Sequence, residues 1–150
     1  PKRAAEVAQV LQARGVPADV LPADNRLPGQ TVAYVVARIG QLGLWYRIAD
    51  TAFVGGSLVP VGGHNPYEPA RLGCAVLHGP DVGNFAEDYA AFHAADAARE
   101  VSDAAALLAA LTAPDLDALR VAAADVAERG HEGAELVAAR ILSLLEGGRG

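Results

Sequence analysis

Short apolar segments alternate with helical stretches along most of this 150-residue chain. Segments 31–37 (TVAYVVA), 51–56 (TAFVGG) and 74–80 (CAVLHGP) are apolar or β-branched, which is typical of strands buried on both faces. Neighbouring parallel strands must be joined by long crossover connections, which are usually helices. The alternation therefore predicts an α/β fold, in which a parallel sheet is covered by helices on both faces and followed by a helical C-terminal tail.

The remaining boundaries follow from helical periodicity and from capping residues. Asn65 is a suitable N-cap with Pro66 at the first helical position, and Ser102 is a second candidate cap. No linker interrupts the pattern, so residues 1–150 are expected to form one domain. The predicted helices are 2–14, 38–50, 65–73, 84–96, 102–113, 114–130 and 131–148, and the predicted strands are 18–22, 31–37, 51–56, 74–80 and 97–101.

Composition excludes several classes of function. The net charge of −6 argues against nucleic-acid binding, which requires a basic surface. A single cysteine, Cys74, excludes an internal disulfide and every zinc site with several cysteines. No signal peptide and no apolar segment long enough to cross a bilayer is recognised, so this segment is expected to be soluble and not to attach a protein to a membrane.

The stretch FVGGSLVPVGGHNPYEP (53–69) carries the clearest functional signal. A strand end, two glycine pairs and a helix start follow one another. Glycine allows the backbone to approach a ligand closely, and a helix start presents unpaired N–H groups that suit phosphate. The pattern is consistent with a phosphate-binding loop, and equally with glycines that serve only tight turns.

Individual polar residues in this region also have two interpretations. Glu68 lies three residues after Asn65, so it either completes a capping box or accepts hydrogen bonds from a ribose diol. His64 is either a polar loop residue or a phosphate donor; with Glu68 it offers two metal ligands, which do not make a site. Asn84 either caps its helix or contacts a ligand. No catalytic triad or dinucleotide fingerprint is present, and no metal or cofactor is predicted.

Three motifs in fixed order resemble a known family. They are FVGGSLVP.GGHNP.EPA (53–70), G..VL.GP (73–80) and NF (84–85). Together they resemble the C-terminal, donor-binding domain of bacterial 3-deoxy-D-manno-octulosonic acid (Kdo) transferases, which are GT-B glycosyltransferases. The resemblance implies a Rossmann-like sheet forming the C-terminal half of a GT-B fold, and a donor, CMP-Kdo, bound without a metal.

The resemblance also assigns candidate site residues. It implies that Gly62, Gly63, His64 and Asn65 face the CMP phosphate and that Glu68 holds the ribose hydroxyls. Gly40 and Gln41 match a segment near the nucleotide, where the family usually has a glutamate in place of Gln41. Val61 stands where many members have an arginine. Further candidate contacts are Gly56, Ser57 and Asn84.

Under this resemblance, the chain is an N-terminally truncated donor domain of a two-domain enzyme that is peripheral to the cytoplasmic face of the bacterial inner membrane. Its partner domain would bind the lipid A precursor and supply the catalytic carboxylate, so no catalytic residue is expected here and the isolated chain is predicted to be inactive. The alternatives are a GT-B donor domain for a UDP- or GDP-sugar, and a non-catalytic nucleotide- or partner-binding α/β module.

Overall fold

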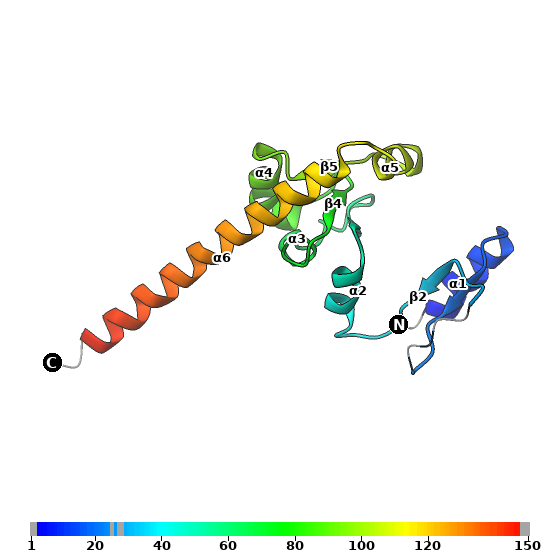
Figure 1. Ribbon diagram of the computed structural model, residues 1–150, viewed down its shortest axis with the longest axis horizontal. Helices are drawn as coiled ribbons and strands as arrows, with labels where there is room; N and C mark the ends of the chain where they lie inside the picture. The colour runs from blue at the N-terminus through cyan, green and yellow to red at the C-terminus, as the bar shows by residue number, and fades with distance from the viewer. Residues whose placement is uncertain (1–2, 25, 27–28, 148–150) are drawn as a thin grey trace. The chain divides into compact units, whose positions relative to one another are not determined.

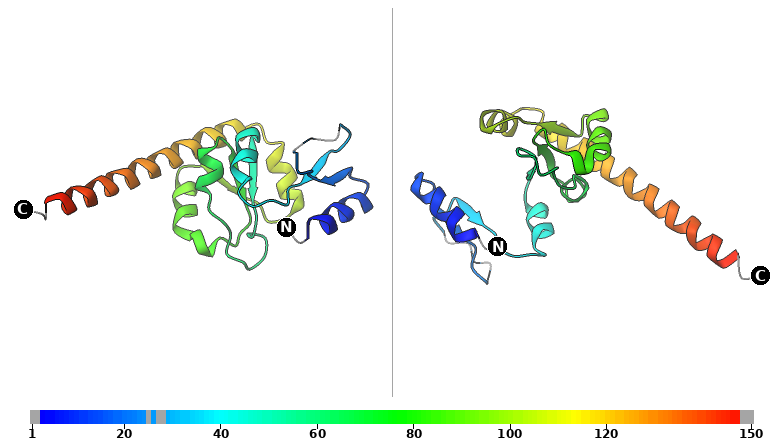
Figure 2. Two further views of the ribbon diagram at one scale, coloured as in Figure 1. Left: turned by 90° about the horizontal axis from the view of Figure 1, so that it is seen from below. Right: turned by 180° about the vertical axis from the view of Figure 1, so that it is seen from behind.

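The computed structural model describes residues 3–24, 26 and 29–147, without the side chains of 131–135 and 145–147. The chain divides into two compact units, Pro1–Leu42 and Gly43–Gly150, and each is described by itself. The prediction that residues 1–150 form one domain stays a prediction. Figures 1 and 2 show the helices and strands of both units.

The first unit consists of helix α1 (Ala4–Ala13) and two parallel strands, β1 (Ala18–Val20) and β2 (Ala33–Val35). Gln12 joins helix to strand, since its side-chain amide donates a hydrogen bond to the Ala18 carbonyl at 2.6 Å. The three residues of β2 are half-buried, although the sequence predicts a longer strand buried on both faces.

A three-stranded parallel sheet with the order β3-β4-β5 is the centre of the second unit. Its strands are β3 (Thr51–Val54), β4 (Ala75–His78) and β5 (Ala98–Glu100). Every residue of β4 is buried. Because side chains alternate along a strand, Val76 faces one apolar cluster with Tyr89 and Phe92, whereas Leu77 faces another with Leu119. The central strand is therefore covered on both faces, as its continuous apolar sequence predicts.

Helices surround this sheet, so the predicted α/β class with a helical tail is confirmed. A short 3-10 helix, η1 (Gly83–Phe85), leads into α4. The α-helices of the unit are α2 (Leu42–Ile48, whose first residue belongs to the other unit), α3 (Tyr67–Arg71), α4 (Ala86–Ala94), α5 (Ala104–Leu111) and α6 (Leu116–Gly147).

The predictions for the last helices of the chain are wrong in two respects. The predicted helices 114–130 and 131–148 form one continuous helix, α6, which crosses beside α3 and α4 in Figure 1. Gly130 does not end it, because this glycine lies inside the helix with the ring of Tyr67 packed against it. Helix α5 is capped by Asp103 and not by Ser102, since the Asp103 carboxylate accepts a hydrogen bond from the Ala106 N–H at 2.8 Å.

Candidate functional site

Two loops meet at the carboxyl ends of β3 and β4. We call residues 55–66 the β3 loop and residues 79–84 the β4 loop. The two strands are parallel neighbours, with Val54 opposite His78, so both loops leave the same edge of the sheet. This edge is where open α/β sheets bind ligands.

Ser57 fastens the two loops together. Its hydroxyl donates to the Val54 carbonyl at 2.6 Å and accepts from the Gly79 N–H at 2.8 Å. Its own carbonyl accepts from the Asp81 N–H at 2.9 Å. Because Ser57 is fully buried at 0% exposure, its side chain positions the loops and offers no surface to a ligand.

Gly62 and Asn84 make the second junction. The Asn84 N–H donates to the Gly62 carbonyl at 2.9 Å, and the Asn84 side chain donates to the Val61 carbonyl at 3.1 Å. Gly62 has φ +90°, and a Cβ there would lie 2.5 Å from the Asn84 amide nitrogen. The interpretation of Asn84 as a helix cap is wrong, because η1 and α4 begin at other residues and neither start has a side-chain cap.

The backbone N–H groups of the β3 loop are not equally available to a ligand. The Gly62 N–H donates to the Asp81 carboxylate at 3.1 Å, and the Gly63 N–H donates to the Gly56 carbonyl at 2.9 Å. Within the part of the chain that the structure describes, the N–H groups of His64 and Asn65 have no hydrogen-bond partner. A phosphate would therefore meet the amides of His64 and Asn65 rather than those of Gly62 and Gly63. Sequence reasoning missed Asp81, because only the folded loop places its carboxylate against Gly62.

His64 and Asn65 also fix the start of α3. The exposed imidazole of His64 lies beside Gly56, with Nε2 3.6 Å from where a Cβ of Gly56 would stand. The His64 carbonyl accepts a hydrogen bond from the buried Tyr89 hydroxyl at 3.0 Å. The Asn65 side chain accepts a hydrogen bond from the Tyr67 N–H at 2.8 Å, which makes a turn just before the helix. The prediction of Asn65 as the N-cap is wrong, because α3 begins at Tyr67 with Pro66 in the cap position and no side chain caps it.

Glu68 is exposed on α3, and its carboxylate is not used by the fold. A capping box would bring this carboxylate to the Asn65 N–H, which instead has no partner among the described residues. Glu68 lines a cavity of about 260 Å³ with Asn65, Tyr67, Arg71 and Leu72. The carboxylate is thus free to accept hydrogen bonds from a ligand.

Beneath the two loops lies a buried histidine, His78. Its Nδ1–H donates to the Gly79 carbonyl at 2.6 Å, which leaves Nε2 to accept from His93 at 3.0 Å. The ring packs on Tyr89 at a centroid distance of 4.3 Å. Burial lowers the pKa of His78 below its ordinary value, and the neighbouring His93 adds to this effect.

Two predicted contacts, Gly40 and Gln41, belong to the first unit. Gly40 has a positive φ of 85°, as a tight turn before α2 requires. Their proximity to a nucleotide stays a prediction.

Neither metal ligation nor membrane insertion is indicated by the described residues. They contain no group of three or more His, Cys, Asp or Glu side chains placed to share a metal ion. Their helices include none that is both long and apolar enough to cross a membrane.

Comparison of the sequence and comparison of the structure both find 3-deoxy-D-manno-octulosonic acid transferases or a domain of one, although no family model matches the chain. The chain is 45% identical over 64 residues to 3-deoxy-D-manno-octulosonic acid transferase of Haemophilus influenzae, covering 42% of this chain and 15% of that protein. The corresponding transferase of Bordetella pertussis is 37% identical over 116 residues, covering 77% of this chain and 24% of that protein. The chain thus spans at most a quarter of the length of these relatives.

A solved structure extends the likeness to the fold. It is the C-terminal CMP-Kdo binding domain of WaaA from Acinetobacter baumannii, with a TM-score of 0.73 and 29% identity. The match covers 84% of this chain and 68% of that domain. The chain is therefore a homologue of the C-terminal domain of the 3-deoxy-D-manno-octulosonic acid transferases.

Proposed function

We propose that this chain binds the nucleotide of CMP-Kdo, as the donor-binding part of a glycosyltransferase that transfers Kdo to a lipid A precursor. The observation that carries the proposal is the match in fold to a CMP-Kdo binding domain over 84% of the chain. The free amides of His64 and Asn65 and the free carboxylate of Glu68 support it, because they lie at the sheet edge where such ligands bind.

The proposed contacts divide by chemistry. The amides of His64 and Asn65 bind the phosphate, with Gly62, Gly63 and Gly56 shaping the loop around it. Glu68 accepts the ribose hydroxyls, while Gly40 and Gln41 lie near the nucleotide. Asn84 and Ser57 hold the loops in place. During transfer, amides aimed at the phosphate stabilise the negative charge that develops on the leaving CMP.

The remainder of the reaction is assigned to sequence outside these 150 residues. The acceptor site and the catalytic carboxylate are proposed to lie there, and the whole enzyme to act at the cytoplasmic face of the bacterial inner membrane. The purified 150-residue chain is therefore expected to transfer no sugar from CMP-Kdo to a lipid A precursor. Turnover by this chain alone would contradict that division of roles.

Calorimetry of the chain with CMP, UDP and GDP tests the proposal. CMP is expected to bind in preference to the other two nucleotides. Glu68→Gln removes a charge-assisted acceptor and is expected to weaken CMP binding by about 1.5–3 kcal/mol, roughly 10- to 150-fold, with an unchanged melting temperature. Preference for UDP or GDP would indicate another sugar donor, and binding of none of the three would overturn the proposal.

A further inference from the structure

The peptide group that joins His64 to Asn65 has two polar ends with different tasks. One end is the Asn65 N–H, which has no hydrogen-bond partner among the described residues. The other end is the His64 carbonyl. In a trans peptide these two groups lie in one plane and point in opposite directions. The direction of the carbonyl therefore decides whether the N–H is presented to a ligand.

The His64 carbonyl is turned toward α4, where the Tyr89 hydroxyl donates a hydrogen bond to it at 3.0 Å. The hydroxyl must be the donor, because a carbonyl oxygen only accepts. Among the described residues, this carbonyl has no second donor: the Glu68 N–H, which a regular helix would bring to it, makes no such bond. The orientation of this peptide group thus depends on one side chain.

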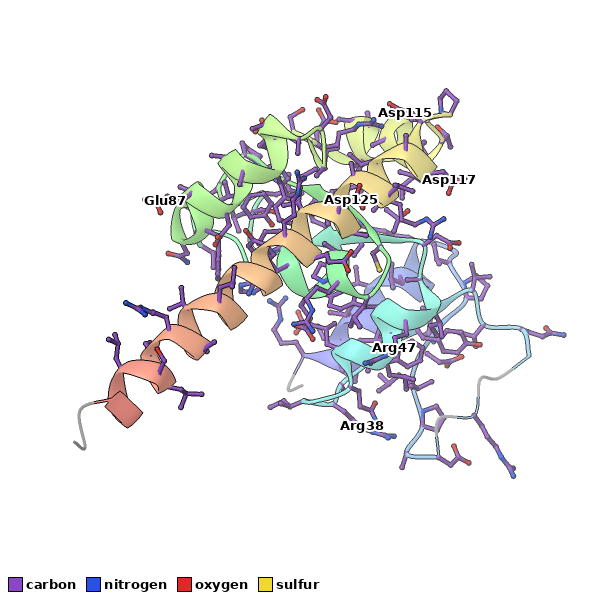
Figure 3. The ribbon with its side chains drawn as sticks, turned by 60° about the vertical axis from the view of Figure 1, so that its left-hand side comes forward. Arg38, Arg47, Glu87, Asp115, Asp117 and Asp125 are labelled. Atoms are coloured by element: carbon purple, nitrogen blue, oxygen red, sulfur yellow. The ribbon has the colours of Figure 1, made fainter. Side chains whose placement is uncertain are left out.

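Tyr89 is held firmly enough to fix that orientation. Glu87, labelled in Figure 3, lies exposed in the first turn of α4. Tyr89 follows two residues later, about 200° further around the helix, and is only 1% exposed. Its ring packs on His78 at a centroid distance of 4.3 Å and belongs to the apolar cluster that contains Phe92. Burial raises the pKa of Tyr89, so its hydroxyl keeps its proton and remains a donor.

Rotation of the peptide group by half a turn would exchange its two ends. The carbonyl oxygen, which carries a partial negative charge, would then face the place proposed for the phosphate, and the N–H would be lost to the ligand. A site that spends part of its time in this orientation binds more weakly, in proportion to the fraction of molecules that are oriented correctly. Fixing the carbonyl therefore favours anion binding without any contact to the anion.

We propose that Tyr89 is a positioning residue for the phosphate of the bound nucleotide: its hydroxyl holds the His64 carbonyl inward and so keeps the Asn65 N–H directed at the phosphate. This inference rests on the proposed function and adds to it a buried residue that does not touch the ligand. The effect is confined to the phosphate, because the nucleoside meets other groups of the site.

Binding of CMP and of cytidine to the 150-residue chain and to Tyr89→Phe tests this role, because cytidine lacks the phosphate. The substitution removes only the hydroxyl and keeps the ring that packs on His78. CMP is expected to bind about fivefold more weakly to the variant, the factor that corresponds to one neutral hydrogen bond. The affinity for cytidine is expected to change less than twofold.

Val126→Ala is the control for stability. Val126 lies in the same buried cluster as Tyr89 but on α6, and it makes no hydrogen bond to either loop through its side chain. Both variants are expected to melt at a lower temperature than the unaltered chain. Only Tyr89→Phe is expected to reduce the ratio of CMP affinity to cytidine affinity, since general loosening of the core would weaken both ligands in parallel.

The NMR signal of the Asn65 amide gives a direct second measurement. At saturating CMP it is expected to move in the unaltered chain and to move less in Tyr89→Phe, whereas cytidine should leave it in place. An equal movement in both chains, equal weakening of CMP and cytidine by Tyr89→Phe, or no weakening of either would overturn the positioning role while nucleotide binding stands. If the unaltered chain binds neither ligand, the proposed function fails and this inference fails with it.

Discussion

Replacing Gly62 by alanine tests whether the β3 and β4 loops pack as described. A Cβ at this position would lie 2.5, 2.6 and 2.8 Å from three side-chain atoms of Asn84, so the Asn84 side chain must move away. Moving it breaks its hydrogen bond to the Val61 carbonyl, a loss of about 1 kcal/mol. Alanine at the φ of +90° costs a further 1–3 kcal/mol or so. The free energy of unfolding is therefore expected to fall by about 2–4 kcal/mol.

Gly73→Ala is a control for the backbone contribution. Gly73 has nearly the same φ, +91°, but a Cβ there meets nothing within 4 Å. The difference between the two variants therefore measures the steric conflict with Asn84, about 1 kcal/mol. In an Asn84→Ala background this conflict is absent, so Gly62→Ala is expected to cost no more than Gly73→Ala does alone.

Urea unfolding followed by the fluorescence of Trp45 provides the assay. Trp45 is the single tryptophan of the chain and lies on α2 in the same compact unit as both loops. Equal destabilisation by Gly62→Ala and Gly73→Ala in the unaltered background would refute the packing of Asn84 on Gly62. The loop geometry proposed for phosphate binding would then lose its support.

Three further predictions concern groups near the site. Burial lowers the pKa of His78, so the unfolded chain binds the proton more readily than the folded chain. Stability that is present above about pH 6.5 is therefore lost as the pH falls toward the folded pKa. Thermal melts between pH 7 and 5 should show a melting temperature that falls with pH, and His78→Gln should reduce this dependence. Asp81→Asn keeps an acceptor for the Gly62 N–H but removes a negative charge beside the proposed phosphate, so CMP should bind about fivefold more tightly. Unchanged or weaker binding would contradict the placement of the phosphate at this loop. Burial raises the pKa of the Cys74 thiol, whose sulfur lies 3.2 Å from two carbonyl oxygens, so a thiol reagent should modify it only after unfolding, and rapid labelling of the folded chain would contradict its burial.

The elements of the fold were predictable because their signals are local. The apolar run of β4 predicts a strand covered on both faces, and alternation with helices predicts parallel pairing, as observed. The break predicted near Gly130 was wrong because tertiary packing against Tyr67 overrides the low helix propensity of glycine. Local sequence contains no information about that contact.

The candidate site was predictable in its position and less so in its detail. The glycines before α3 mark the loop, but the sequence does not show which backbone N–H groups form hydrogen bonds within the protein. Asp81 and Gly56 accept hydrogen bonds from the N–H groups of Gly62 and Gly63. The N–H groups without a partner in the described chain are therefore those of His64 and Asn65, the next two residues.

The fastening of the two loops has a consequence for how such a site changes over evolutionary time. Its bonds run through backbone groups, one buried serine and one asparagine, while Leu58, Val59 and Val61 at the loop surface remain 44%, 57% and 57% exposed. Substitutions of these three side chains are expected to leave the scaffold intact, so the rim of the site can gain or lose a charge without changing the hydrogen bonds beneath it. In this loop, the exposed side chains can therefore change ligand preference, while the backbone groups and the buried side chain maintain the fold.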